Sequence, residues 1–477
     1  MISGAFINRV KLLLAPTIYS HRKSMHSIIL CSLLILFLAT RLYNFSNRLG
    51  FDHDQEKAAE AAWGIIVERQ PSLIGIETST GGVFAGPLLN WSHAVFMYLF
   101  KLDPVSLGYQ AIFFSALAIL LLFKLVYKIY GIKPALLAAL TYIISARLIA
   151  YDISASPISY ITFLSILTIY LTYETVYVKK HHLLPLLAFV LTLGYHVHLT
   201  LLLQIPAVLL ILLYRKARFT KRQAILSMIA FVIPLLSYFA FELRHNLLMT
   251  GNLISLVSKG DRTDQFKFID TITNFITVEA ETIIPATYSY LFIFLMVAAY
   301  FRLRAHINKT FLTETLIFLT MPLVCLLLYQ GHIPDYYFLV ATPAAIILAS
   351  NLFFSISKKL HHLVLAFLIF AIFVNFQSSI FYLHNPFSIN LKKSVVEYIK
   401  EESQGKDISL YYEIPTSLNY GFEYLLKWSK VTFNNESQNI YVIDYSTPQE
   451  FSSAKYEKEG RTVEIKSFEP FHVVSIK

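Results

Sequence analysis

The chain has 477 residues, of which 56% are hydrophobic, 15% are aromatic and 15% are charged, with a formal net charge of +10. Average soluble domains contain about 45–50% apolar and about 25% charged residues, so the main body of this chain cannot be a soluble enzyme. The aromatic content also excludes a disordered chain. The basic excess lies between apolar runs, where it reflects orientation in a membrane rather than binding of nucleic acid.

The apolar residues form runs of about 15–22 residues separated by short basic connectors. A helix that crosses a bilayer core of about 30 Å needs a run of this length. We therefore predict a polytopic α-helical membrane protein with about eleven spans, the first an uncleaved signal anchor. At the break Tyr195–His198, the sequence is also compatible with one long bent helix in place of two short ones. The predicted spans lie near residues 27–40, 105–126, 134–150, 157–177, 183–195, 197–213, 223–241, 284–301, 311–329, 335–354 and 363–381.

The distribution of Lys and Arg predicts the orientation of the spans. Short, strongly basic connectors alternate with longer and less basic ones, which places the N-terminus in the cytoplasm of a cell (inner or plasma) membrane. Two segments on the outside are long, residues 43–104 and 243–283. The apolar runs stop near residue 384, so we predict a membrane domain over 1–383 and a small extracytoplasmic α/β domain over 384–477. Its expected strands are 408–414, 440–445 and 472–476, and its expected helices are 392–402 and 420–428.

The first outer segment opens with the acidic residues Asp52, Asp54 and Glu56. Asp52 followed by Gln55 is a helix-capping pattern, and acidic residues also suit a first helical turn, which gives Asp52 a structural interpretation. The structural interpretation accounts less well for Asp54, because the side chain of Asp54 would project from the first turn at the membrane surface. Glu56 fits either role.

Polar residues elsewhere also gather at the outer ends of the spans, where ionisable groups are candidates for function. Gly82 and Gly86 lie in an irregular turn segment whose amides and hydroxyls could receive a phosphate or a sugar. Individually, each group has an ordinary structural explanation, such as an interfacial anchor or a turn. The other groups are Arg147 with Asp152, His196 with His198, the segment Glu242–His245, and the segment His332–Tyr337.

Taken together, these features resemble the GT-C membrane glycosyltransferases, in particular the family 39 type that includes protein O-mannosyltransferases and aminoarabinose transferases. The resemblance rests on the acidic opening of the first loop with His53-Asp54-Gln55, a surface helix, and the segment Gly81-Gly82-Val83-Phe84-Ala85-Gly86-Pro87. It extends to Ser145-Ala146-Arg147, His198-Leu199-Thr200, Phe241–His245 and His332–Tyr337, and covers roughly residues 27–381.

The resemblance implies transfer of a sugar from a polyprenyl-phosphate donor to a glycan, lipid or protein acceptor at the outer face, with inversion. A single carboxylate suffices as general base, because polyprenyl phosphate is a good leaving group, so Asp54, Asp52 and Glu56 are the catalytic candidates. Cationic side chains must stabilise the departing phosphate, and Arg147, Arg244, His245 and His332 are the candidates. The expected substrate-binding residues are Gly82, Gly86, Tyr195, His198 and Tyr336. A divalent cation, Mg²⁺ or Mn²⁺, on Asp52 and Asp54 stays open, since the spacing does not demand one.

The main alternative is a transporter or flippase of lipid-linked sugars. Such a protein is expected to carry charged residues deep within its spans and to show repeated halves. Here the charges lie at one face, which favours the enzyme. A non-catalytic scaffold would leave the one-sided clustering unexplained.

Overall fold

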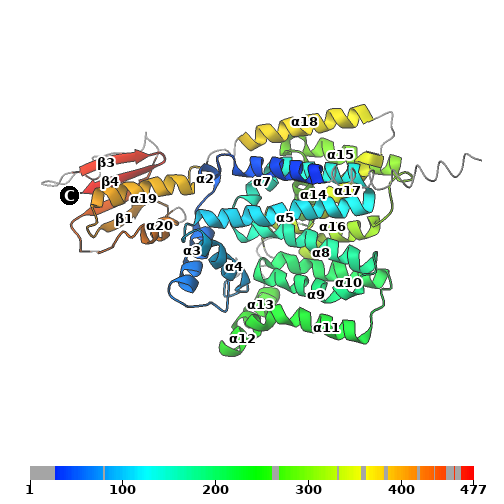
Figure 1. The fold of residues 1–477 in the computed structure, drawn as a ribbon, viewed down its shortest axis with the longest axis horizontal. Coiled ribbons are helices and arrows are strands. Elements are labelled where there is room, and N and C mark those ends of the chain that lie inside the picture. Colours follow the sequence, from blue (N-terminus) through cyan, green and yellow to red (C-terminus); the bar gives the residue numbers. More distant parts are fainter. Residues whose placement is uncertain are drawn as a thin grey trace, which may run out of the picture.

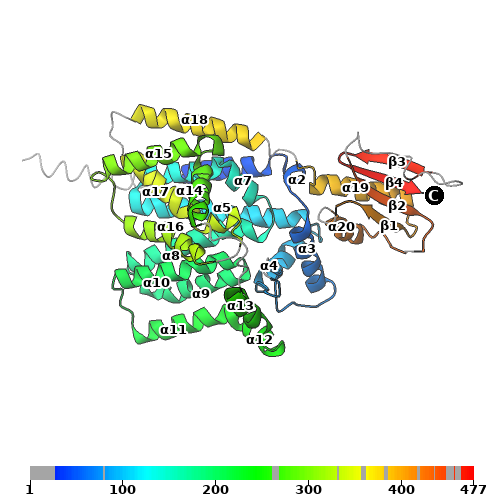
Figure 2. The same ribbon diagram turned by 180° about the vertical axis from the view of Figure 1, so that it is seen from behind.

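The computed structural model describes residues 27–78, 81–259, 268–329, 332–355, 361–380, 385–415, 419–434, 436–446, 456 and 463–476. The molecule consists of a bundle of helices with a small sheet-containing domain at one end (Figures 1 and 2). This arrangement confirms a mostly helical chain with a small C-terminal α/β region.

Helices occupy all the predicted apolar runs, but their lengths differ. They are Ser27–Leu42, α5 (Val105–Tyr130), α6 (Ile132–Ile144), α7 (Ala146–Asp152), α8 (Ile161–Val176), α9 (Leu184–Leu193), α10 (Gln204–Tyr214), α11 (Lys221–Val232), α12 (Leu236–Arg244), α15 (Ala286–Leu303), α16 (Leu312–Leu327), α17 (Thr342–Ser355) and α18 (His361–Ile380). By length and composition, two of the described helical units can cross a membrane, Val105–Tyr130 and Lys221–Arg244. The count rises to four if two bent pairs of helices are each one span. These are α6 with α7, bent by 66°, and α14 (Phe268–Ile283) with α15, bent by 94°. The number of eleven spans therefore stays a prediction.

The chain reverses direction at Tyr195–His198, so the two runs on either side form two antiparallel helices. Two short 3₁₀ turns, η3 (Gly194–His196) and η4 (Leu199–Leu203), separate α9 from α10. A Cβ atom on Gly194 would lie 2.6 Å from the Cβ of Leu201, so the tight turn requires glycine here. At the far ends of these helices His181 Nδ1 lies 3.1 Å from the carbonyl oxygen of Arg218, which places both connectors at one end of the bundle.

Ion pairs join the same connectors. The carboxylate of Glu174 contacts Lys128 and, at 2.7 Å, Lys180, while Arg215 contacts Glu314. The basic connectors predicted to share the cytoplasmic side therefore lie together. The C-terminal domain lies at the opposite end, beside α3 (His53–Ile66) and α4 (Leu88–Leu99) (Figure 1).

The second long outer segment, predicted as a loop, contains two helices. These are α13 (Leu248–Lys259) and α14 (Phe268–Ile283). The helix α14 carries an apolar side that packs through Phe275 and Val278 against Phe338 and Leu326. It thereby brings its acidic residues to the outer end of the bundle.

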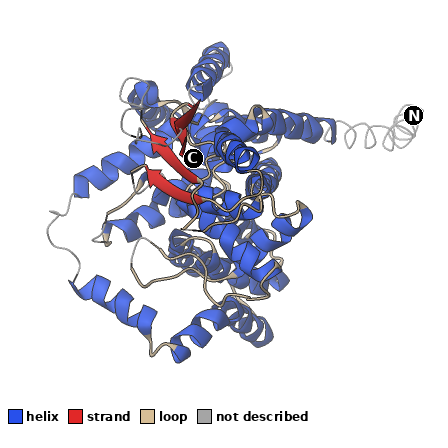
Figure 3. Cartoon of the chain, turned by 90° about the vertical axis from the view of Figure 1, so that its left-hand side faces the viewer, coloured by secondary structure: helices blue, strands red, loops and turns tan. Residues whose placement is uncertain are grey.

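The C-terminal domain has a four-stranded sheet of order β1-β2-β4-β3, seen in front of the helices in Figure 3. Strand β1 pairs with β2 in parallel and the other pairs are antiparallel. The central strands β2 and β4 are largely apolar and buried, whereas the edge strand β3 carries Glu464 and Lys466 and is largely exposed. The sequence prediction named three strands and missed β3. The elements are α19 (Ile389–Ser403), β1 (Ser409–Glu413), α20 (Phe422–Trp428), β2 (Ile440–Tyr445), β3 (Val463–Phe468) and β4 (Phe471–Ile476).

The C-terminal domain is attached to the first outer segment by backbone hydrogen bonds. Phe51 N donates to the carbonyl oxygen of Phe387 at 3.3 Å, and Ile389 N donates to that of Leu49 at 2.8 Å. The short helix α2 (Phe45–Arg48) lies between this attachment and the first helix of the bundle. The start of α3 therefore lies between the membrane bundle and the C-terminal domain.

Candidate active site

Asp52 begins α3 and also binds the C-terminal domain. Its backbone N–H donates to Gln55 Oε1 at 3.1 Å, and the two residues form the capping box that the sequence predicted. The Oδ1 atom of Asp52 accepts a hydrogen bond from the Lys392 ammonium at 3.2 Å. The fully buried ammonium also donates to the carbonyl oxygens of Phe51 at 2.8 Å and Tyr420 at 2.7 Å. Asp52 thus holds α3 in place.

Glu56 lies one turn further along α3 and is only 3% exposed. Its Oε1 accepts from the backbone N–H of Tyr424 at 3.0 Å, and Gly421 also donates to this carboxylate. Burial raises the pKa of Glu56, while these two backbone N–H groups act in the opposite direction. Both Asp52 and Glu56 therefore have partners in the C-terminal domain.

Asp54 differs from its two acidic neighbours because its side chain is 47% exposed and its contact is the adjacent His53, with Nδ1 and Oδ1 3.3 Å apart. The His53 ring in turn packs edge-on against Tyr420, with ring centroids 4.6 Å apart. The Asp54 carboxylate lies within electrostatic range of the Tyr336 phenol. The interaction with Tyr336 links Asp54 to the membrane bundle, whereas Asp52 and Glu56 each accept a hydrogen bond from the C-terminal domain.

An aromatic cluster stands beside Asp54. The His198 ring lies 5.7 Å from that of Tyr336 and 5.5 Å from that of Tyr337, both edge-on, and the two tyrosine rings are 5.3 Å apart. The first turn of α3 is attached to the bundle near this cluster, because Gln55 Nε2 donates to the carbonyl oxygen of Ser154 at 2.6 Å. The predicted residues Asp54, His198 and Tyr336 are thus brought together from three distant segments.

Arg147 reaches the same region from the start of α7. Its guanidinium contacts Glu281 and lies 3.7 Å from Asp335, which precedes Tyr336. The neighbouring carboxylate of Glu279 is buried and accepts from Thr342 Oγ1 at 3.2 Å. Glu279 and Glu281 were not predicted as site residues, because no helix was expected in the outer segment 243–283. Two acidic residues at the end of an amphipathic helix were the signal that could have revealed them.

Asp152, grouped with Arg147 in the sequence, has a different partner. It forms a buried ion pair with Arg41 at 2.8 Å and accepts from Tyr142 OH at 3.0 Å. This pair joins the first helix of the bundle to the end of α7, and removal of either partner would leave the other charge buried without its counterion.

The glycine segment packs against the 194–198 turn. Gly86 N donates to the carbonyl oxygen of Tyr195 at 3.1 Å, and a Cβ on Gly86 would lie 2.0 Å from His196 Nδ1. Gly82 adopts φ +71° and its carbonyl oxygen accepts from Asn252 Nδ2 at 3.1 Å. The two histidines of the turn therefore have opposite neighbours: His196 packs on Gly86, and His198 packs on the tyrosines.

The remaining candidates lie at the edge of this arrangement. Arg244 and His332 are exposed. The His245 ring stacks on Phe241 with centroids 4.0 Å apart, and the Tyr195 hydroxyl is buried without a hydrogen-bond partner among the described residues. Their assignment to phosphate and substrate stays a prediction.

A bound divalent cation also stays a prediction. Within the described ranges, no three His, Cys, Asp or Glu side chains are grouped so that they could hold a metal ion. Moreover, the Lys392 ammonium already contacts Asp52 and would repel a cation placed between Asp52 and Asp54.

Residues 85–240 match the family model described as dolichyl-phosphate-mannose-protein mannosyltransferase. No curated protein sequence matches the chain. Among solved structures, it is similar to ArnT from Cupriavidus metallidurans, with TM-scores of 0.63 in the apo state and 0.60 bound to undecaprenyl phosphate, 9% identity, and coverage of 95% of this chain and 98% of ArnT.

A second similar structure is the archaeal oligosaccharyltransferase AglB from Archaeoglobus fulgidus in complex with an inhibitory peptide and a dolichol-phosphate. The TM-score is 0.54 at 11% identity, over 91% of this chain and 70% of AglB. Such low identities establish the fold, and both structures have the GT-C fold. The chain therefore has the GT-C fold, and its residues 85–240 are similar to the mannosyltransferase family; together these findings indicate a glycosyltransferase.

Proposed function

We propose that the protein transfers a sugar from a polyprenyl-phosphate donor to a glycan, lipid or protein acceptor at the outer end of the bundle. The ArnT and AglB structures in complex with undecaprenyl phosphate and dolichol-phosphate support a donor of this class. The observation that carries the proposal is the position of Asp54, a half-exposed carboxylate beside the aromatic cluster of His198, Tyr336 and Tyr337.

Asp54 is the proposed general base. The acceptor hydroxyl attacks the anomeric carbon while its proton passes to Asp54, and the bond between that carbon and the phosphate oxygen breaks. The electron pair of the breaking bond leaves with polyprenyl phosphate, and a single displacement of this kind inverts the configuration. Asp52 and Glu56 are less suited to act as base, because the Lys392 ammonium and two backbone N–H groups hold their oxygens.

Arg147 is the proposed partner of the leaving phosphate. Its planar guanidinium can form paired hydrogen bonds with phosphate oxygens. Glu281 and Asp335 hold the guanidinium beside Tyr336, and they would have to share it with the donor. Arg244 is exposed at the end of α12, where it could meet the donor from the solvent side.

We assign the C-terminal domain and this site to the extracytoplasmic side of the cell membrane. The clustering of basic connectors at the opposite end supports this orientation. A flippase remains the alternative, but the described buried pair, Arg41 with Asp152, lies at the outer end of the helices and not midway along them.

The proposal is tested with the purified full-length protein and a panel of polyprenyl phosphates that carry different sugars. Release of free polyprenyl phosphate in the presence of a total envelope extract is the expected result. Transbilayer movement of a labelled donor without any release would favour the flippase.

A further inference from the structure

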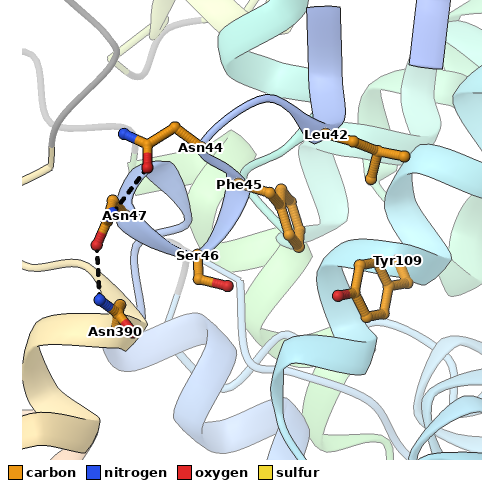
Figure 4. Close-up of a pocket in the computed structure, with 7 residues that line it drawn as sticks. All are labelled: Leu42, Asn44, Phe45, Ser46, Asn47, Tyr109 and Asn390. Atoms are coloured by element: carbon orange, nitrogen blue, oxygen red, sulfur yellow. Dashed lines mark hydrogen bonds between the residues drawn. The ribbon is translucent and has the colours of Figure 1, made fainter. Parts of the chain in front are cut away.

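A polar groove lies where the bundle meets the C-terminal domain (Figure 4). It has a volume of about 520 Å³, within the range of about 300–1,000 Å³ that is usual for small-molecule sites. Its polar lining comes from three segments that are distant in sequence: the α2 turn, α5 and α19. The lining side chains are Asn44, Ser46, Asn47, Tyr109 and Asn390, with Phe45 and Leu42 as apolar walls.

Three asparagine side chains form a fixed row along one side of the groove. Asn390 Nδ2 donates to Asn47 Oδ1 at 2.8 Å, and Asn47 Nδ2 donates to Asn44 Oδ1 at 2.7 Å. A primary amide carries two N–H donors and an oxygen with two lone pairs. Asn390 and Asn47 each donate one N–H in this row, so the second N–H of each amide can donate to a ligand.

The opposite wall adds hydroxyl groups and an aromatic ring. Figure 4 shows the hydroxyls of Ser46 and Tyr109 pointing towards one another across the groove. The Tyr109 ring is stacked on Phe45 with centroids 5.2 Å apart and packs against Phe100 at 5.3 Å. The aromatic wall is therefore rigid, and its hydroxyl is directed into the groove.

The chemistry of this lining selects a neutral ligand with many hydroxyl groups. The groove is lined by uncharged side chains, whereas a bound phosphate or carboxylate would call for a cationic partner. Amides and hydroxyls that both donate and accept hydrogen bonds match the hydroxyls of a sugar, and the apolar walls match the C–H faces of its ring. We infer that the groove binds a sugar residue of a neutral glycan, either free or as the head group of a membrane lipid.

The groove is also connected to the start of α3. Asn390 lies on α19 two residues before Lys392, which contacts Asp52, and Asn47 accepts a backbone hydrogen bond from Asn385 at 2.8 Å. A ligand that joins Asn390 to Ser46 would hold α19 against α2, and with it the segment that presents Asp54. The further role of the groove, to hold the acceptor glycan, rests on the proposed function, whereas the binding of a sugar in the groove does not.

The test measures sugar binding without turnover. The full-length protein is studied in lauryl dimethylamine oxide, a detergent without sugar, by saturation-transfer NMR. One arm uses methyl glycosides of glucose, galactose, mannose and N-acetylglucosamine, and the other uses octyl β-glucoside with octyl tetraoxyethylene as the sugar-free control. Saturation of at least one sugar ring is expected. Binding of octyl β-glucoside alone would identify a glycolipid head group, and binding of the methyl glycosides as well would show that the sugar suffices.

Variants assign the signal to the groove. Asn390→Ala and Tyr109→Phe each remove one hydrogen-bonding group, so we expect the dissociation constant of the bound sugar to rise about three- to tenfold. Lys400→Ala, at an exposed position on the same helix, should leave it unchanged. Failure of every sugar to bind, equal competition by octyl tetraoxyethylene, or unchanged binding in both groove variants would overturn the inference. Polyprenyl phosphate release, measured separately, would still report on the proposed function.

Discussion

Lys392 Nζ lies 3.2 Å from Asp52 Oδ1, which joins the C-terminal domain to the N-cap of the helix that carries Asp54. The lysine side chain is fully buried, and its burial lowers the pKa of the ammonium while Asp52 acts to raise it. Two carbonyl oxygens share the remaining ammonium protons. The position of α3 therefore depends on a residue 340 positions away in the sequence.

We expect Lys392→Met to loosen the C-terminal domain, because the carbonyl oxygens of Phe51 and Tyr420 lose their donor at a cost of about 1–3 kcal/mol each when buried. Hydrogen exchange of residues 47–56 should accelerate. The matched control is Lys393→Met, which breaks a half-exposed ion pair with Asp103 at 2.7 Å and should change stability by less than about 1 kcal/mol. Equal effects of the two variants would contradict a specific role for Lys392.

Glu56 should make the attachment of the C-terminal domain depend on pH. Burial raises the pKa of Glu56 in the folded state. The contribution of Glu56 to the stability of the folded state is therefore greatest below the ordinary carboxyl pKa and is lost as the pH rises through the raised value. We therefore expect the protection factor of the Tyr424 amide, in which the intrinsic pH dependence of exchange is divided out, to fall from acidic to neutral pH.

Glu56→Gln keeps an oxygen acceptor for Tyr424 without a charge, so the pH dependence of the protection factor at that amide should flatten. Glu56→Ala leaves the buried N–H without a partner and should accelerate exchange at every pH. A Gln variant that retains the full pH dependence would assign it to another group.

Local patterns in the sequence were sufficient where the interacting residues are neighbours. The Asp52–Gln55 spacing correctly predicted the start of α3, and the consecutive apolar residues predicted β2 and β4. The strand β3 was missed because it lies at the edge of the sheet, where it is largely exposed and carries charged residues in place of an apolar run.

Long-range partners lie beyond such patterns. The carboxylates of Glu281 and Asp335 are 134 and 188 positions after Arg147 and reach it only because α14 and η6 (Asp335–Val340) pack beside α7. Likewise, the sequence left Glu56 balanced between two roles because its partner α20 lies in another domain. Composition predicted the class of protein, but only the topology shows which charges meet.

The two candidate arginines can be separated by substitution. If Arg147 stabilises the departing phosphate, Arg147→Ala should lower turnover by about 10²–10³-fold, and Arg147→Lys should lower it less while losing the paired hydrogen bonds. The same comparison applies to Arg244, and release of polyprenyl phosphate is the readout. Arg69→Ala, an exposed arginine of the first outer segment, is the control. Near-wild-type release for both the Ala and Lys variants at one position removes that arginine from the site.

The orientation can be tested with reporters. We expect a reporter inserted after Lys359 to be active only in the cytoplasm and one fused at the C-terminus to be active only outside, because the connectors joined by Glu174 and Glu314 share one end of the bundle. Both reporters on one side of the membrane would contradict the predicted topology.

The central prediction distinguishes Asp54 from Asp52. Asp54→Asn keeps the shape of the side chain and removes its charge, and among the described residues the half-exposed carboxylate contacts the adjacent His53, so the substitution should not disturb folding. We expect turnover to fall by about 100-fold or more, as for loss of a general base, with the melting temperature and the donor KM little changed.

Asp52→Asn should have the opposite profile. An asparagine can still cap α3, so turnover should stay within a few-fold of the wild-type value. However, the buried Lys392 ammonium loses its negative partner, so the melting temperature should fall. If Asp52→Asn abolishes turnover without a loss of stability while Asp54→Asn is fully active, the base is Asp52. If neither substitution affects release of polyprenyl phosphate, neither aspartate is the base. The enzyme then loses its main support, and the flippase becomes the better explanation.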